Sequence, residues 1–123
     1  MTKILLADDE QDIRQVLVRR LQAEGYEVVT AQDGEEALRK AHQERPDVIL
    51  LDIMLPKKNG NTVAAELQER PDTAKIPVIF ITALVNTNEA KVMNYQSGGN
   101  QIMGKPIDSR DLVELIERAR NAA

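Results

Sequence analysis

Each of four short apolar runs in this sequence ends in a side chain that could bind a metal ion or a phosphoryl group. The runs are residues 4–7, 48–51, 78–81 and 102–104, and the residues that follow them are Asp8 and Asp9, Asp52, Thr82 and Lys105. If the runs are parallel strands of one sheet, these side chains emerge at the same edge, where open α/β sheets place their ligand sites. Carboxylates, a hydroxyl and an ammonium group would then converge, a set that can hold a divalent cation together with a phosphoryl group.

The acidic residues also have simpler interpretations. Asp8, Asp9 and Glu10 could act only as a helix cap, with acids that favour the helix dipole, and Asp52 could be a turn residue. A cap does not explain why adjacent carboxylates, which repel one another, directly follow a buried strand. A bound cation explains it, and Mg²⁺ prefers such oxygen ligands. Close to Asp8 and Asp9, Asp52 is a candidate nucleophile or metal ligand.

Thr82 and Lys105 are weaker signals by themselves. A threonine at a strand end is usually structural, because β-branched residues favour strands, and a single lysine is usually a surface residue. The Thr82 hydroxyl could still donate a hydrogen bond to a phosphoryl oxygen. Lys105 precedes Pro106, which favours a fixed turn. An ammonium group among carboxylates offsets their repulsion and can bind a phosphate.

The apolar periodicity alternates between strand and helix along the chain. Strands are predicted at residues 4–7, 26–31, 47–51, 76–81 and 101–104, and a helical pattern follows each of them. The fourth helix is expected to begin in the capping-box sequence 86–89 and to end at Gly98-Gly99. Strict alternation predicts an α/β fold, a (βα)5 three-layer sandwich whose parallel five-stranded sheet has helices on both faces. By analogy with flavodoxin-like folds, the expected strand order is 2-1-3-4-5, with the second and fifth strands at the edges.

Length and composition exclude several classes of protein. The chain has 123 residues, so residues 1–123 are expected to form one domain, with no output domain in this chain. A net charge of −4 at pH 7 argues against a nucleic-acid partner. The absence of cysteine excludes a disulfide scaffold, a thiolate zinc site and a cysteine nucleophile. No apolar run approaches the ~20 residues of a membrane span, and no signal peptide is predicted. We therefore expect a cytoplasmic protein without a membrane partner.

The segments that carry the reactive side chains resemble the response-regulator receiver domain of bacterial two-component signalling, nearly end to end. They are residues 3–10, 45–56 with Gly60, 76–83 and Lys105-Pro106. The resemblance implies a fold like that of the chemotaxis regulators and a phosphoacceptor role in a phosphorelay. It implies weak self-phosphorylation and autophosphatase chemistry, and no true enzyme activity. The implied partners are a histidine kinase or histidine phosphotransfer protein as donor and an unidentified downstream protein as target.

The resemblance also assigns a role to each acidic residue. Asp52 corresponds to the phosphoacceptor. The implied cofactor is Mg²⁺, bound by Asp9, by Asp52 and by the carbonyl oxygen of Met54. Asp8 would contribute to the metal site through a water molecule. In-line transfer to a carboxylate needs positioning and charge neutralisation more than acid–base chemistry, and these residues could supply both.

Thr82 and Lys105 correspond to the residues that hold the phosphoryl oxygens. The acyl phosphate would add about two negative charges at this edge, enough to reorganise a nearby loop that has two arrangements. The face expected to respond consists of the fourth helix, the fifth strand and the last helix. Three residues before the lysine, the family usually has Tyr or Phe, whose rotation accompanies the response. This chain has Ile102 there, so it lacks that aromatic side chain.

Three other functions fit parts of the pattern. A hydrolase of the haloacid-dehalogenase type also uses a strand-end aspartate with Mg²⁺, but it needs a second aspartate where this chain has Met54. A flavin-binding module would need a Ser/Thr-rich loop after the first strand, and the acids at 8–10 would repel a phosphate. The main alternative is a phosphorylation-independent receiver-like interaction module, which Ile102 favours. Such modules usually lack one of the acids or the lysine, and this chain has all of them.

Overall fold

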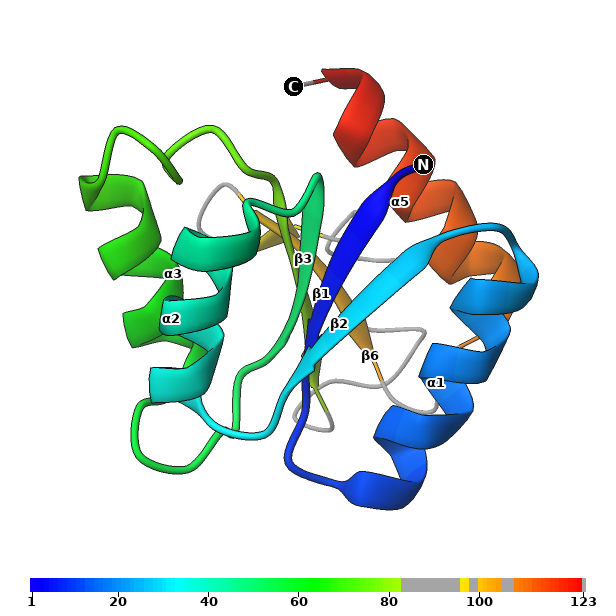
Figure 1. The fold of residues 1–123 in the computed structure, drawn as a ribbon, viewed down its shortest axis with the longest axis horizontal. Helices are drawn as coiled ribbons and strands as arrows, with labels where there is room; N and C mark the ends of the chain where they lie inside the picture. The colour runs from blue at the N-terminus through cyan, green and yellow to red at the C-terminus, as the bar shows by residue number, and fades with distance from the viewer. Residues whose placement is uncertain (83–95, 98–99, 105–107, 123) are drawn as a thin grey trace.

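Figure 1 shows the fold in the computed structural model, which describes residues 1–82, 96–97, 100–104 and 108–122. Five strands run parallel in one sheet, and they are β1 (Lys3–Ala7), β2 (Glu27–Ala31), β3 (Val48–Asp52), β4 (Val78–Thr82) and β6 (Asn100–Gly104). Their order across the sheet is β2-β1-β3-β4-β6. The predicted parallel sheet of order 2-1-3-4-5 is therefore confirmed, with β6 as the fifth parallel strand.

A further strand, β5 (Gln96–Ser97), pairs antiparallel with the outer side of β6. Two predictions were therefore wrong: the strand at 101–104 is not the edge of the sheet, and the fourth helix does not extend to Gly98. Gly98-Gly99 lies between the paired residues in the sequence, and Gly-Gly is typical of hairpin connections as well as of helix ends. The predicted start of the fourth helix, residues 86–89, lies outside the described residues, and so does Lys105.

Among the described residues, four helices cover the two faces of the sheet, as predicted for a three-layer sandwich. They are α1 (Gln11–Ala23) and α5 (Ser109–Ala122) on one face and α2 (Gly34–Glu44) and α3 (Gly60–Glu69) on the other (Figure 1). Within the described parts of the chain, no helix is both long and apolar enough to cross a membrane.

Successive residues of β1 pack into two separate cores. Ile4 and Leu6 belong to the core under α1 and α5, and Leu5 and Ala7 belong to the core under α2 and α3. Side chains alternate between the faces of a strand, so a strand covered on both sides must be apolar throughout. At the start of β1, the Lys3 backbone N–H donates to the Asp47 carboxylate at 2.8 Å.

A hydrogen bond connects helix α5 to the chain entering β2. Tyr26 is buried, its hydroxyl donates to a carboxylate oxygen of Glu117 at 2.6 Å, and Arg120 pairs with the same carboxylate at 3.0 Å. Burial, followed by the bond to Glu117, raises the pKa of Tyr26 to about 12. The same bond lowers the pKa of Glu117. The interaction therefore needs a protonated phenol and an ionised carboxyl group.

We expect Tyr26→Phe to lower the melting temperature by a few degrees at neutral pH, because it removes a hydrogen bond to a charged partner. The Tyr26 contribution is complete below the ordinary tyrosine pKa of ~10 and is lost as the pH rises toward 12. The Glu117 contribution is present above the ordinary glutamate pKa of ~4.3 and is lost as the pH falls through its lowered value. Thermal unfolding at several pH values should show the largest difference from wild type near neutrality. A difference independent of pH would contradict this assignment.

Candidate functional site

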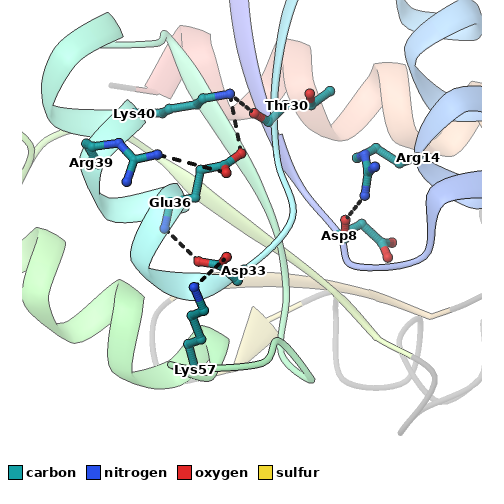
Figure 2. Close-up of polar contacts among 8 residues, drawn as sticks. All are labelled: Asp8, Arg14, Thr30, Asp33, Glu36, Arg39, Lys40 and Lys57. Carbon is teal, nitrogen blue, oxygen red and sulfur yellow. Dashed lines mark hydrogen bonds and ion pairs between the residues drawn. The ribbon is translucent and has the colours of Figure 1, made fainter.

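The end of β1 fixes the first carboxylate of the site. Asp8 is fully buried, and its backbone N–H donates to the carbonyl of Ala31 at 3.1 Å. One carboxylate oxygen of Asp8 accepts from the backbone N–H of Glu10 at 2.9 Å. The guanidinium of Arg14 donates to the Asp8 backbone carbonyl at 2.7 Å (Figure 2). Asp8 is thus held at the turn into α1, while the next two residues reach the surface.

The acids at residues 8–10 do not cap α1 with their side chains in the way that the simple cap interpretation predicts. Glu10 is the N-cap residue of α1, and its side chain makes no capping hydrogen bond. The Asp8 carboxylate accepts from the backbone N–H of Glu10, which comes before the first turn of α1 and is not one of the N–H groups that a cap satisfies. The simple cap interpretation therefore does not account for the acidic run.

The end of β3 fixes Asp52. Its side chain is 3% exposed, and one carboxylate oxygen accepts from the backbone N–H of Met54 at 3.0 Å. This bond is an Asx turn, so the interpretation of Asp52 as a turn residue describes part of its environment. The Met54 side chain is 60% exposed, which leaves its backbone as the part of the residue that could serve a buried site.

Gly60, the first residue of α3, allows that helix to start against the Asp52 backbone. Its N–H donates to the carbonyl of Ile53 at 2.8 Å. A Cβ atom at this position would lie 2.5 Å from the Asp52 carbonyl oxygen and 2.8 Å from the Ile53 Cα. Real Cβ atoms do not approach backbone atoms so closely, so a side chain here would displace the backbone of Asp52.

The acidic side chains from β1 and β3 form one cluster. Each of Asp8, Asp9, Glu10 and Asp52 offers a carboxylate oxygen, and these atoms all lie within 4.8 Å of one another. Asp8 and Asp52 are buried, whereas Asp9 and Glu10 are exposed. Like charges at this separation repel, and a divalent cation would neutralise them. Hard oxygen donors of this kind suit Mg²⁺, so the donor set fits the expected cofactor.

Thr82 lies at the corresponding end of the neighbouring strand. Asp52 is in register with Ile81 on β4, so Thr82 is one residue further along that strand, and it is fully buried. Thr82 is in register with Gly104 on β6. Lys105 follows Gly104 in the sequence and lies outside the described residues.

Ile102 is part of the core and not of the surface. Its side chain is 4% exposed, and it is in register with Phe80 on the adjacent strand β4. Both residues belong to the core under α2 and α3. The position that usually carries an aromatic switch residue therefore holds a packed aliphatic side chain in this protein.

Glu10 is the residue of the cluster that is not among the metal ligands predicted from the sequence. It was the third acid of the run 8–10 and was interpreted only as a cap. Its carboxylate is within reach of the other three, but it is exposed, so water screens its charge. Adjacency to two predicted ligands was the signal that could have identified it.

We expect Glu10→Gln to weaken Mg²⁺ binding only about three-fold, because an exposed carboxylate contributes a screened Coulomb attraction. Calorimetric titration with Mg²⁺ at low and at high salt would measure the effect, which should shrink as salt rises. Glu24→Gln is the matched control, since Glu24 is an exposed acid just beyond the other end of α1. A large loss of affinity that does not depend on salt would instead make Glu10 a direct ligand.

Comparison with known proteins extends these observations. The family model for the response regulator receiver domain matches residues 4–117. PhoP, the alkaline phosphatase synthesis transcriptional regulatory protein of Bacillus subtilis, is 41% identical over 110 residues, which are 89% of this chain and 45% of that protein. The chain therefore spans less than half of that relative's length.

Two solved structures resemble this one over almost their whole length. Chemotaxis protein CheY4 of Vibrio cholerae has a TM-score of 0.81 and 33% sequence identity, over 97% of this chain and 98% of that chain. The receiver domain of a sensor histidine kinase from Pseudomonas aeruginosa has a TM-score of 0.83 and 29% identity, over 98% of both chains. That structure holds a magnesium ion coordinated in its active site cleft.

Proposed function

Because this chain belongs to the response regulator receiver domain family, the phosphoacceptor modules of two-component signalling, we propose that Asp52 is its phosphoacceptor. Members of this family are signalling modules and not catalytic enzymes. The observation that carries the assignment is the buried Asp52 carboxylate at the carboxyl edge of the sheet, within 4.8 Å of three other carboxylates. A buried aspartate in such a cluster is suited to a reaction that depends on charge neutralisation.

We propose Mg²⁺ as the cofactor of this site. Asp9, Asp52 and the Met54 carbonyl would bind the ion directly, and Asp8 would bind it through water. The clustered carboxylates support this set, and the magnesium-containing receiver domain from Pseudomonas aeruginosa is a precedent. When bound, the ion would neutralise charge on the transferred phosphoryl group.

The proposed reaction moves a phosphoryl group from a phosphohistidine to Asp52. A carboxylate oxygen of Asp52 attacks phosphorus, and the new P–O bond forms as the P–N bond breaks and the donor imidazole leaves. The Thr82 hydroxyl would donate to a phosphoryl oxygen, and the Lys105 ammonium would pair with another. The Asx turn to Met54 restrains the Asp52 carboxylate before the donor arrives, which favours in-line attack.

The proposed donor is a histidine kinase or a histidine phosphotransfer protein. We propose that the phosphorylated form changes the face that includes β6, α5 and the chain between β4 and β5. The buried position of Ile102 against Phe80 favours one alternative, a receiver that binds its target without phosphorylation. The two functions differ in whether Asp52 acquires a phosphoryl group at all.

Incubation with Mg²⁺ and acetyl phosphate, followed by intact mass measurement, tests the proposal. The wild-type protein should gain one phosphoryl mass, and peptide mapping should locate it on the peptide that contains Asp52. Chelation of Mg²⁺ by EDTA should prevent the gain. A protein that stays unlabelled both with acetyl phosphate and with several phosphorylated kinases would support the interaction module.

A further inference from the structure

The start of α2 packs against the loop between β3 and α3, residues 53–59, which carries Met54. The Gly34 backbone N–H donates to the carbonyl of Pro56 at 3.2 Å, and the Lys58 N–H donates to the same carbonyl at 2.7 Å. The loop at 53–59 is therefore hydrogen-bonded to α2, a helix that contributes no side chain to the acidic cluster.

Gly34 is needed at this contact for its size. A Cβ atom at this position would lie 1.9 Å from the Lys58 carbonyl oxygen and 2.6 Å from the Lys58 Cβ. Its φ angle is not in the left-handed region, so conformational freedom is not the reason for glycine. Any side chain would force the turn at Lys58 to move away from α2.

The loop adopts a strained turn at the point of contact. Lys57 has a φ of 67°, and the bond from the Lys58 N–H to the Pro56 carbonyl closes a γ-turn around it. A γ-turn with positive φ is rare for residues other than glycine, and such strain persists only where the surroundings impose it. The surroundings here include Asp33, whose carboxylate lies 3.7 Å from the Lys57 ammonium (Figure 2).

Asp33 belongs to the same structural unit as Gly34. Its other carboxylate oxygen accepts from the Glu36 N–H at 2.8 Å and caps α2 (Figure 2). Glu36 in turn pairs with Lys40 at 3.4 Å. The partner of Lys57 is thus fixed by the first turn of α2.

We propose that Gly34 is a positioning residue for the metal site: by contact with Pro56 and Lys58 it sets the position of the loop that carries Met54, whose carbonyl is a proposed metal ligand. This inference rests on the proposed function, in which that carbonyl binds Mg²⁺. The two ends of the loop are held by hydrogen bonds from the Met54 N–H to the Asp52 carboxylate and from the Gly60 N–H to the Ile53 carbonyl. The contact with α2 constrains the middle of the loop, at Pro56 and Lys58.

The test is the Mg²⁺ affinity of Gly34→Ala, measured by calorimetric titration of the whole chain. We expect an affinity about ten-fold weaker, the usual effect of losing an outer support of a metal ligand. The Met54 amide resonance of the metal-free protein should shift. The matched control is Ala37→Gly, on the same helix and buried, which costs stability but adds no atom next to Pro56 or Lys58. It should keep the wild-type affinity.

A second variant keeps the inference testable if Gly34→Ala does not fold. Lys57→Gly relieves the positive φ and removes a positive charge. If only backbone strain or charge mattered, Mg²⁺ binding should stay unchanged or become tighter, because the ion would meet less positive charge. Loss of positioning predicts weaker binding. Wild-type affinity in Gly34→Ala, equal losses in Gly34→Ala and Ala37→Gly, or unchanged or tighter binding in Lys57→Gly would overturn the inference. A wild-type protein that does not bind Mg²⁺ would instead overturn the proposed function.

Discussion

The Asp52→Asn protein is expected to gain no phosphoryl mass under conditions in which the wild-type protein is labelled nearly completely. Asparagine has almost the same shape, and its side-chain oxygen can still accept the hydrogen bond from the Met54 N–H. The variant should therefore keep the fold and the Asx turn. An amide is a very weak nucleophile compared with a carboxylate, so the covalent step itself is lost.

The matched control for this variant is Asp47→Asn. Asp47 is an exposed aspartate just before the opposite end of the same strand, and its carboxylate accepts from the Lys3 backbone N–H. An asparagine can also accept that bond, so labelling of the control should equal that of wild type. Equal labelling of Asp52→Asn and wild type would show that another residue is the acceptor.

Addition of Mg²⁺ is expected to stabilise the wild-type fold by about 2.7 kcal/mol when the ion is at ~100 times its dissociation constant. The reason is that only the folded chain brings the four carboxylates within 4.8 Å of one another. In metal-free protein these charges oppose folding, so Asp52→Asn should raise the free energy of unfolding by about 1 kcal/mol. The same variant should lose most of the Mg²⁺ effect.

Urea unfolding of the two proteins, each with and without Mg²⁺, measures all four free energies. Asp47→Asn should respond to Mg²⁺ as wild type does, because Asp47 is not part of the cluster. A metal-free Asp52→Asn protein clearly less stable than wild type would contradict the idea that the cluster opposes folding.

The sequence predicted the parts of this fold that depend on local pattern. The central strands β1, β3 and β4 each contain a run of four apolar residues, and each prediction lay within two residues of the observed bounds. The predicted acids Asp8, Asp9 and Asp52 come together because parallel strands bring their carboxyl ends to one edge. Much of this site was therefore accessible from residue type and topology, with the family resemblance assigning the roles.

Other features depend on contacts between distant segments, which leave little trace in a single sequence. Nothing in the local sequence around Gly34 indicates that the Lys58 carbonyl would occupy the space of a side chain at this position. Strand β5 was missed because Gly98-Gly99 suits a helix end and a hairpin equally well. For Glu10, a helix cap is a sufficient local explanation, so the sequence alone does not mark it as a member of the cluster.

The apolar run that fills most of β1 has a consequence for how the alignment of this strand with its neighbours is encoded. Residues 4–7 are all apolar, and they supply both cores alternately. A shift by one residue would exchange the two sets of side chains but would expose no apolar surface to water. The hydrophobic pattern within the strand therefore specifies its register only weakly. The polar ends specify it instead, because the Lys3 N–H donates to the Asp47 carboxylate at one end and the Asp8 N–H donates to the Ala31 carbonyl of β2 at the other. We therefore expect that the first effect of an insertion or deletion inside this strand is a displaced acidic cluster.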